Sequence, residues 1–237
     1  MKLPLIFSIL FASLVIISAC KNNGNDSVAD QEDMAREDHK WSQDIDFEEK
    51  VSVYEDENRD IWQKPDRVID ILAPLEDKVV VDLGAGTGYF AFRLVQKAQK
   101  VIAVDIDQDF VNFMEKKRLL LPLEQQDKFE VRLAEAQDPH IHNEEADAVL
   151  IVNTYAYLQN RIKYFANLKK GLKPGAELVI IEFKMKNIPN GPPEEEKVSI
   201  STVQSELNAA GFQDIDVDDR TLDYQYIVTA HTASAIQ

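Results

Sequence analysis

The sequence has little cysteine and little positive charge, and these two shortages narrow the possible functions. Its 237 residues include one cysteine, Cys20, which excludes an internal disulfide framework and a zinc site built from several thiolates. Lys and Arg number 26 against 42 Asp and Glu, giving a formal net charge of −16. Such a chain repels phosphate backbones at long range, so no nucleic acid partner is expected.

The apolar residues at the N-terminus are grouped in one run. Lys2 is followed by LPLIFSILFASLVIISA, which ends in small residues directly before Cys20, an order typical of a secretory signal peptide. The end of this run resembles the lipobox of bacterial lipoproteins, which implies a signal peptide over residues 1–20 and a lipid anchor at Cys20. The expected location is the bacterial cell envelope, on the periplasmic side of the membrane. The alternatives are an uncleaved signal anchor and, if the signal is misread, a cytoplasmic protein.

The next segment is acidic and poor in apolar residues. Between Asp26 and Asp60 there are 14 acidic and 4 basic residues, with few apolar ones before Val51. Such a segment buries too little apolar surface to offset its ordering entropy. We therefore expect a flexible acidic tether over residues 21–50 and a folded domain over residues 51–237. A specific acidic docking site is the alternative interpretation of the tether.

From about Tyr54 onward, helical and strand patterns alternate. Short apolar runs predict strands, at 78–82, 101–105, 129–133, 147–152, 177–183, 212–217 and 224–230. Amphipathic patterns predict helices, at 54–63, 65–72, 88–98, 107–120, 161–172 and 201–212, the first two being separate or joined by a kink at Pro65. This alternation indicates an α/β fold: a Rossmann-like, doubly wound, mostly parallel sheet with helices on both faces.

Four residues are expected to mark the ends of two of these helices. Asp107 is placed to cap the helix that follows it. Ser201 and Gln204 have the spacing of a capping box for the last helix, and Gly211 is expected to end it.

A glycine-rich turn, VVVDLGAGTGY, follows the first predicted strand. Gly84, Gly86 and Gly88 allow a sharp turn and a close approach of the backbone to a ligand, at the strand end where α/β sheets bind ligands. The dinucleotide pattern needs its third glycine at the position of Tyr89, and the P-loop pattern needs a Lys-Ser or Lys-Thr pair that is missing here. Neither phosphate-binding pattern fits.

The acidic residues around this turn favour a ligand without phosphate. Asp82, two residues before the first glycine, would repel a cradled phosphate by roughly 1 to 4 kcal/mol at about 4 Å. It would instead attract the ammonium group of S-adenosylmethionine (SAM), which has no phosphate. Asp105 ends the second strand 21 residues after Gly84, where a carboxylate can accept both ribose hydroxyls.

The chain resembles the class I SAM-dependent methyltransferases from about Arg59 to Ala230. The resemblance rests on VVVDLGAGTG, VIAVDID, DAVLIVNTYAYL, LKPGAELVIIEF and AGF before two last strands. It extends loosely to a bacterial subgroup similar to ubiquinone/menaquinone and arsenite methyltransferases. It implies a seven-stranded sheet with an antiparallel last strand, and cofactor contacts by Asp82, Gly84, Ala85, Gly86, Gly88, Asp105, Ile106, Glu135, Ala136 and Asn153. For Glu135 a solvated loop acid is an equal alternative.

Few side chains suggest a catalytic role. Methyl transfer from a sulfonium needs mainly the alignment of donor and acceptor, and a general base only for some acceptors. Tyr155 and Tyr157, after the fourth strand, are the catalytic candidates because they would lie over the cofactor pocket, with ordinary packing as the alternative.

Two further pairs of residues are candidates for the site. His140 and His142 could bind a metal with nearby carboxylates, but no third ligand is fixed by spacing, and no metal site is predicted. Trp62 and Gln63 could lie across the mouth of the active site, with packing as the alternative for Trp62.

Two functions agree with these patterns. The first is a SAM-dependent methyltransferase that acts on a small-molecule or lipid-like acceptor. The second is a membrane-tethered, non-catalytic binding protein that retains the pocket, because export would separate the domain from SAM made inside the cell. The oligomeric state is not determined by the sequence.

Overall fold

The computed structural model describes residues 46–189 and 191–235. The expected signal peptide, and the tether up to residue 45, lie outside the described residues. At the expected end of the tether, the structure has a helix, α2 (Phe47–Tyr54), which is capped by the Asp46 side chain through the Glu49 amide at 3.0 Å. The folded domain therefore includes residues 47–50 as well.

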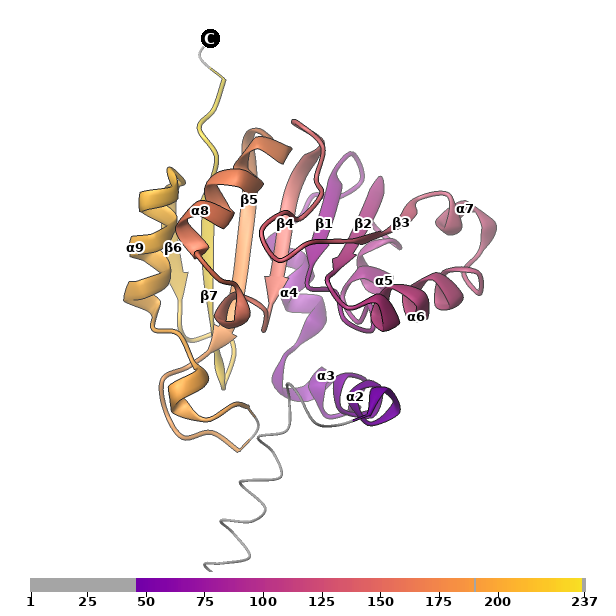
Figure 1. Ribbon diagram of the computed structural model, residues 1–237, viewed down its shortest axis with the longest axis horizontal. Helices are drawn as coiled ribbons and strands as arrows, with labels where there is room; N and C mark the ends of the chain where they lie inside the picture. Colours follow the sequence, from indigo (N-terminus) through magenta and orange to yellow (C-terminus); the bar gives the residue numbers. More distant parts are fainter. Residues whose placement is uncertain (1–45, 190, 236–237) are drawn as a thin grey trace, which may run out of the picture. The chain divides into compact units, whose positions relative to one another are not determined.

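The centre of the domain is one sheet of seven strands in the order β3-β2-β1-β4-β5-β7-β6 (Figure 1). The neighbours from β3 to β5 pair in parallel, and β7 pairs antiparallel with both β5 and β6. This arrangement confirms the expected fold class. The strands are β1 (Val79–Leu83), β2 (Lys100–Asp105), β3 (Phe129–Leu133), β4 (Ala146–Val152), β5 (Leu172–Phe183), β6 (Gln213–Asp218) and β7 (Gln225–His231).

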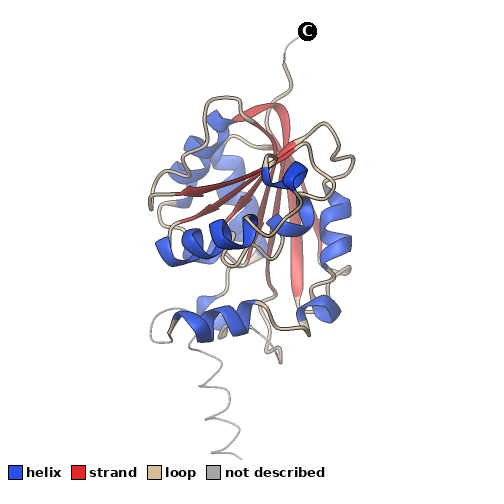
Figure 2. Cartoon of the chain, turned by 90° about the vertical axis from the view of Figure 1, so that its right-hand side faces the viewer, coloured by secondary structure: helices blue, strands red, loops and turns tan. Residues whose placement is uncertain are grey.

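Helices cover both faces of the sheet, as Figure 2 shows. Successive side chains of a strand point to opposite faces, so Val80 and Val81 belong to two different apolar clusters. The cluster of Val80 includes residues of α4 (Pro65–Ile71), α5 (Ala91–Leu94) and α6 (Gln108–Arg118); the cluster of Val81 includes residues of α8 (Arg161–Leu168) and α9 (Ile200–Ala210). Burial on both faces explains why the strands β1, β2 and β4 are apolar runs without alternation.

The helix boundaries correct some of the expectations. The segment before β1 forms two short helices, α3 (Arg59–Trp62) and α4, so the alternative with separate helices is confirmed. Asp107 caps α6 and Gly211 ends α9 with φ 87°, both as expected. The capping box at Ser201 is wrong, because α9 begins earlier and the Ser199 side chain accepts the Thr202 amide at 3.1 Å.

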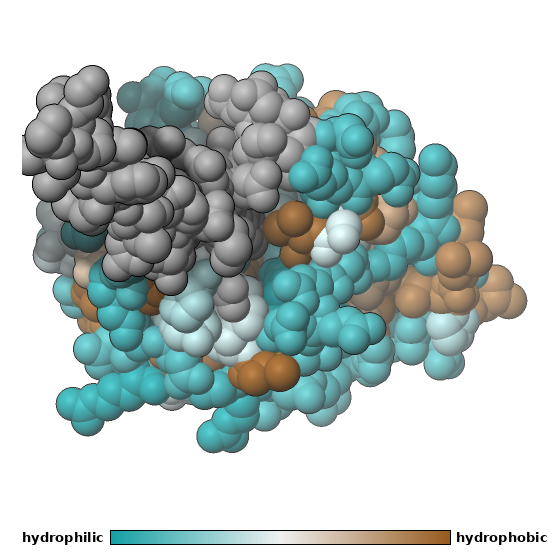
Figure 3. Space-filling view, turned by 90° about the horizontal axis from the view of Figure 1, so that it is seen from below, coloured by the Kyte–Doolittle hydropathy of each residue, from teal (hydrophilic) through white to brown (hydrophobic). Residues whose placement is uncertain are grey.

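Much of the surface seen from below is hydrophilic (Figure 3). Apolar side chains gather at its right-hand side, where α6 and α7 (Leu123–Gln126) lie in Figure 1, and the exposed leucines of that region are Leu119, Leu120 and Leu123. Across residues 46–189 and 191–235, the structure has no helix long and apolar enough to span a membrane.

Candidate functional site

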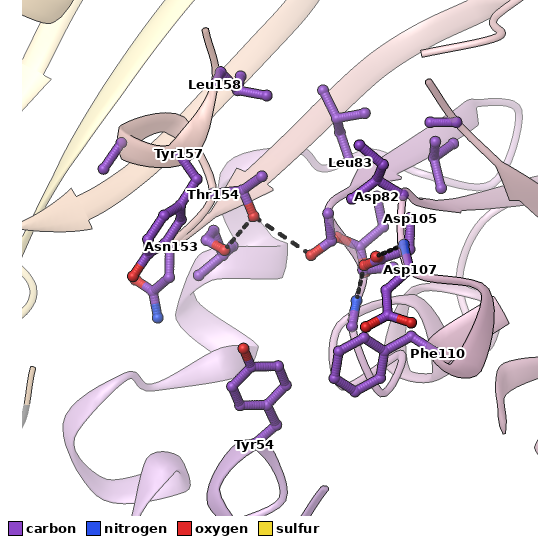
Figure 4. A pocket seen from close by; sticks show the side chains of 18 of the residues that line it. Tyr54, Asp82, Leu83, Asp105, Asp107, Phe110, Asn153, Thr154, Tyr157 and Leu158 are labelled. Carbon is purple, nitrogen blue, oxygen red and sulfur yellow. Dashed lines mark hydrogen bonds between the residues drawn. The ribbon is translucent and has the colours of Figure 1, made fainter. Parts of the chain in front are cut away.

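A cavity of about 510 Å³ opens at the carboxyl ends of β1, β2 and β4. Its volume is in the range of small-molecule sites. In Figure 4, Asp82, Asp105 and Asp107 lie on one side, Asn153 and Tyr157 on the other, and Tyr54 approaches from α2. Residues of β1, β2, β4, β5, α2 and α3 all contribute to its lining. The cavity lies at the edge of the sheet where the sequence places the ligand.

The glycine turn is held against the end of β2. The amides of Gly84 and Ala85 both donate to the Val104 carbonyl, at 2.8 and 2.9 Å, and the Gly86 amide donates to Asp105 Oδ2 at 2.7 Å. Gly84 has φ 75°, and a Cβ built there would lie 2.2 Å from Thr154 Oγ1. Glycine is thus required at position 84 for two reasons: the backbone is left-handed there, and Thr154 leaves no room for a side chain.

Gly88 has a different role from the one expected. It does not line the cavity, although Gly84, Ala85 and Gly86 do. A Cβ at Gly88 would lie 2.6 Å from the Phe92 ring and 3.3 Å from Met114. The third glycine therefore allows close packing of α5 and α6 behind the turn.

We expect Gly84→Ala to destabilise the protein by more than the roughly 1–2 kcal/mol that an L residue pays in a left-handed conformation. The added methyl group overlaps Thr154, so either the glycine turn or the segment that follows β4 has to shift. Thermal unfolding measures the effect. Gly175→Ala is the matched control, because Gly175 has the same φ of 75° but its Cβ would lie 3.8 Å from the nearest atom. Equal losses in the two variants would contradict the steric account.

Two buried carboxyl groups lie beside the turn. Asp82 is 3% exposed, and its Oδ2 has no hydrogen-bond partner within the described part of the chain. Burial raises the pKa of Asp82 to about 7. Asp105 is 8% exposed and accepts the Gly86 and Asp107 amides, and burial raises its pKa as well. Since each carboxylate oxygen accepts two hydrogen bonds, both groups have capacity left for a ligand.

The cavity as a whole is negative. Five carboxyl groups line it, against two basic side chains: Asp82, Asp105, Asp107, Glu135 and Glu182 against Lys50 and Arg59. The two bases are also engaged, because Lys50 lies 3.7 Å from Asp107 and the Arg59 guanidinium stacks 4.0 Å from the Tyr89 ring centre. An anion would be repelled from such a site and a cation attracted.

The other expected cofactor contacts all line the cavity. Ile106 is exposed, and an apolar side chain at that place suits the flat face of an adenine. The Ala136 and Glu135 positions follow β3, and the Glu135 side chain lies 3.7 Å from His140 Nε2. Asn153 has φ 55°, an uncommon value for a residue other than glycine.

The structure separates the two catalytic candidates. Tyr155 is fully buried and does not line the cavity; it packs on Phe165, and its hydroxyl donates to Glu206 at 2.6 Å. The expectation for Tyr155 is therefore wrong: the short 3-10 helix η1 (Tyr155–Tyr157) turns its ring into the core. Tyr157 lines the cavity and is half-exposed. Partial burial raises its pKa above 10.0, so it is a hydrogen-bond donor at neutral pH and a poor base.

The Trp62, His140 and His142 side chains do not line the cavity. Trp62 packs between Phe183 and Tyr224, with ring centres 6.0 and 6.3 Å away, and does not line the cavity. His140 is tied to the Leu133 carbonyl through Nδ1 at 2.9 Å. The described residues contain no group of three or more His, Cys, Asp or Glu side chains placed to hold a metal ion.

Two groups of cavity residues were missed from the sequence. Tyr54 and Arg59 come from α2 and α3, and the Tyr54 ring stacks on Phe110 of α6 at 5.3 Å. Their only sequence signal is an aromatic and a basic residue within an acidic segment. Glu182 of β5 is 3% exposed, and burial raises its pKa to about 7. An acid at the end of the apolar run LVIIEF is a signal that was available, because buried carboxyl groups cluster at functional sites.

Comparison with known proteins shows which proteins the domain resembles. Residues 81–180 match the family model described as a methyltransferase domain. A SAM-dependent methyltransferase of Aquifex aeolicus is 27% identical, with a TM-score of 0.71 over 80% of this chain and 100% of that chain. The chain thus has the fold of the class I methyltransferases and, over residues 81–180, matches a methyltransferase domain. SAM is the cofactor of this domain, and the residues present fit it, because a negative cavity with an unpartnered buried carboxylate oxygen suits a ligand that carries a sulfonium and an ammonium.

Two other relatives show how far the similarity reaches. A tRNA U34 carboxymethyltransferase of Mannheimia succiniciproducens is 29% identical over 119 residues, which are 49% of this chain and 36% of that protein. The match thus spans little more than a third of that relative. The [4+2]-cyclase SpnF is 16% identical, with a TM-score of 0.60 over 72% of this chain and 81% of that chain. The fold of the methyltransferase domain is therefore shared by proteins that differ in activity.

Proposed function

We propose that this protein is a SAM-dependent methyltransferase whose acceptor is a small molecule or a lipid-like compound. The observation that carries the proposal is the buried Asp82 carboxyl with one unpartnered oxygen, in a cavity lined by five carboxyl groups and two bases. Asp82 would hold the ammonium group of the cofactor, Asp105 the ribose hydroxyls, and Ile106 the adenine. When bound, the cofactor supplies a methyl group activated by a sulfonium.

The acceptor would enter between Asn153, Tyr157 and Glu182. These residues orient the acceptor and exclude water, and the alignment of the two reactants supplies most of the rate enhancement. Glu182 would take the proton of the acceptor, because a carboxyl group whose pKa is about 7 can be ionised and still hold a proton at neutral pH. Tyr157 would donate a hydrogen bond.

Charge argues against tRNA as the acceptor, although the named carboxymethyltransferases act on it. The chain has a net charge of −16, whereas binding to a phosphate backbone depends on Lys and Arg clusters. A neutral or cationic acceptor meets no such repulsion.

The proposal is tested with the purified full-length chain. Calorimetry with SAM should give micromolar binding, and transfer of a labelled methyl group should be followed separately into small metabolites, lipid extract and total tRNA. Label in the first or second fraction supports the proposal. Label in tRNA alone would refute the acceptor class, and absence of SAM binding by the folded protein would refute the function.

The lipid anchor at Cys20 is part of the proposal and rests on the sequence of residues 1–20. Growth with radioactive palmitate should label the protein, which should fractionate with membranes, and Cys20→Ser should abolish both results. Unlabelled wild-type protein in the soluble fraction would contradict the anchor.

A further inference from the structure

A chain of buried and partly buried hydrogen bonds connects the cavity wall to the helix α3. Arg59 Nε donates to Gln63 Oε1 at 2.9 Å, Gln63 Nε2 donates to Gln225 Oε1 at 3.1 Å, and Gln225 Nε2 donates to Asn153 Oδ1 at 2.5 Å. Gln63 and Gln225 are both fully buried, and neither lines the cavity. Arg59 and Asn153, the two ends of the chain, do line it. We call these four residues the amide relay.

Arg59 determines which group donates and which group accepts in every hydrogen bond of the amide relay. A guanidinium has five N–H donors and no acceptor, so Gln63 must turn its oxygen toward Arg59. Its Nε2 then faces Gln225, which must in turn accept with its oxygen and donate with its nitrogen. The carboxamide of Asn153 is thereby fixed with Oδ1 inward. Its Nδ2 makes no hydrogen bond within residues 46–189 and 191–235, and Asn153 lines the cavity.

We propose that Gln63 and Gln225 are positioning residues that hold Asn153 with its N–H donors toward the ligand, so that this wall of the cavity recognises an oxygen atom. The proposal rests on the proposed function. The oxygen belongs to the carboxylate of the methionine part of SAM or to the acceptor. Asp82, on the opposite wall in Figure 4, serves the ammonium group, so the two walls would distinguish the two ends of an amino acid.

The relay also gives a reason for two fully buried glutamines that the apolar core does not need. Burying a carboxamide is unfavourable unless its donor and acceptor are both satisfied. Each glutamine satisfies one donor and one acceptor within the relay. Because Arg59 also donates to the Tyr54 carbonyl, α2 and α3 are coupled to the orientation of Asn153.

Gln63→Glu tests this proposal with almost no change of shape. The carboxylate stays ionised beside Arg59 and can only accept hydrogen bonds. Gln225 must then donate toward residue 63 and present its oxygen to Asn153, whose Nδ2 turns inward. In ligand-free protein at pH 8, NMR should show slow exchange of the side-chain amide protons of Gln63 and Gln225 and fast exchange of those of Asn153. In the variant, the Asn153 protons should become protected.

Ligand binding identifies the source of the oxygen. S-adenosylhomocysteine has the carboxylate, whereas 5′-methylthioadenosine lacks the amino acid part. In Gln63→Glu, calorimetry should show about tenfold weaker binding of the first, the size of one lost hydrogen bond to a charged group, and less than twofold change for the second. Protected Asn153 protons with unchanged S-adenosylhomocysteine affinity would assign the oxygen to the acceptor.

Two control variants separate the effect of the relay from other effects of the substitution. Gln213→Glu makes the same change on the exposed strand β6 and should leave both affinities unchanged. Gln63→Met breaks the relay without reversing it and should give an intermediate loss. Unchanged exchange of the Asn153 protons in Gln63→Glu, or equal losses for the two ligands, would overturn the proposal. Failure of the wild type to bind S-adenosylhomocysteine would instead refute the proposed function, while the exchange pattern still tests the relay.

Discussion

Asp105→Ala is expected to weaken SAM binding at least about 100-fold. In the proposed function this carboxylate accepts two ribose hydroxyls. Hydrogen bonds to a charged group are worth about 1.5–3 kcal/mol each, so losing both would cost about 3 kcal/mol or more. Asp105 also receives the Gly86 and Asp107 amides, at 2.7 and 2.9 Å, so the same substitution loosens the glycine turn. The lost ribose hydrogen bonds and the loosened turn should both weaken SAM binding. Calorimetry measures the loss.

The matched control is Asp109→Ala. Asp109 lies in the first turn of α6, two residues after the cap, and does not line the cavity. Its removal should change the affinity by less than twofold. An Asp105→Ala protein that unfolds cooperatively and binds SAM within threefold of the wild type would contradict the assignment of Asp105 to the ribose.

The second large effect concerns Asp82 and pH. The pKa of Asp82 is raised to about 7, mainly by burial; Asp105 raises it further and Arg59 lowers it. If the cofactor binds only the ionised carboxylate, about one protein in eleven is competent at pH 6 and about ten in eleven at pH 8. The dissociation constant for SAM should therefore be about tenfold higher at pH 6. Asp82→Asn should bind weakly at both values and lose this pH dependence.

Asp82→Asn should weaken SAM binding but increase the stability of the folded protein without ligand. Because the folded-state pKa lies above the ordinary 3.8, the folded protein without ligand binds this proton more tightly than the unfolded chain does. The carboxyl group therefore lowers stability progressively as pH rises from about 4 to about 7. Asp82→Asn should be more stable than the wild type at pH 8, by up to about 4 kcal/mol less the cost of burying the new amide hydrogens. This gain in stability should vanish near pH 4, where the wild-type carboxyl is protonated in the folded state.

Chemical denaturation of the wild type and of Asp82→Asn at pH 4 and pH 8 measures this difference in stability. A variant less stable than the wild type at pH 8 would show that Asp82 supports the fold rather than the ligand. A wild-type affinity for SAM that is equal at pH 6 and pH 8 would show that the ionised Asp82 is not what the cofactor binds.

The glycine turn shows how much of the site can be predicted from a short stretch of sequence. Asp82, Gly84 and Gly86 could be assigned to the ligand cavity because a strand, a positive φ and a following helix are all encoded within a few consecutive residues. Gly88 belongs to the same motif but packs against Phe92 and Met114 instead. Motif spacing alone does not distinguish a glycine needed by the ligand from one needed by a neighbouring helix.

Two tyrosines after the fourth strand show what local sequence cannot predict. Tyr155 and Tyr157 are two positions apart, yet one is buried against Phe165 and the other lines the cavity. The difference depends on the 3-10 turn between them, whose dihedral angles are set by packing of η1 against β5 and α8. For Glu182, the sequence indicates a buried acid at the end of an apolar strand, but only the tertiary structure shows that this acid lines the same cavity as Asp82 and Asp105.

The sequence by itself determined the order of the strands along the chain, the position of the glycine turn and the negative charge of the ligand site. Hydrophobic periodicity and backbone preferences act within a few residues, so they can be followed along the chain. Only the tertiary structure decided which distant side chains meet. Gln63 and Gln225 are 162 positions apart and share a buried hydrogen bond. That contact exists because α3 is placed beside β7, and this placement is set by packing of the whole domain, which no local pattern specifies.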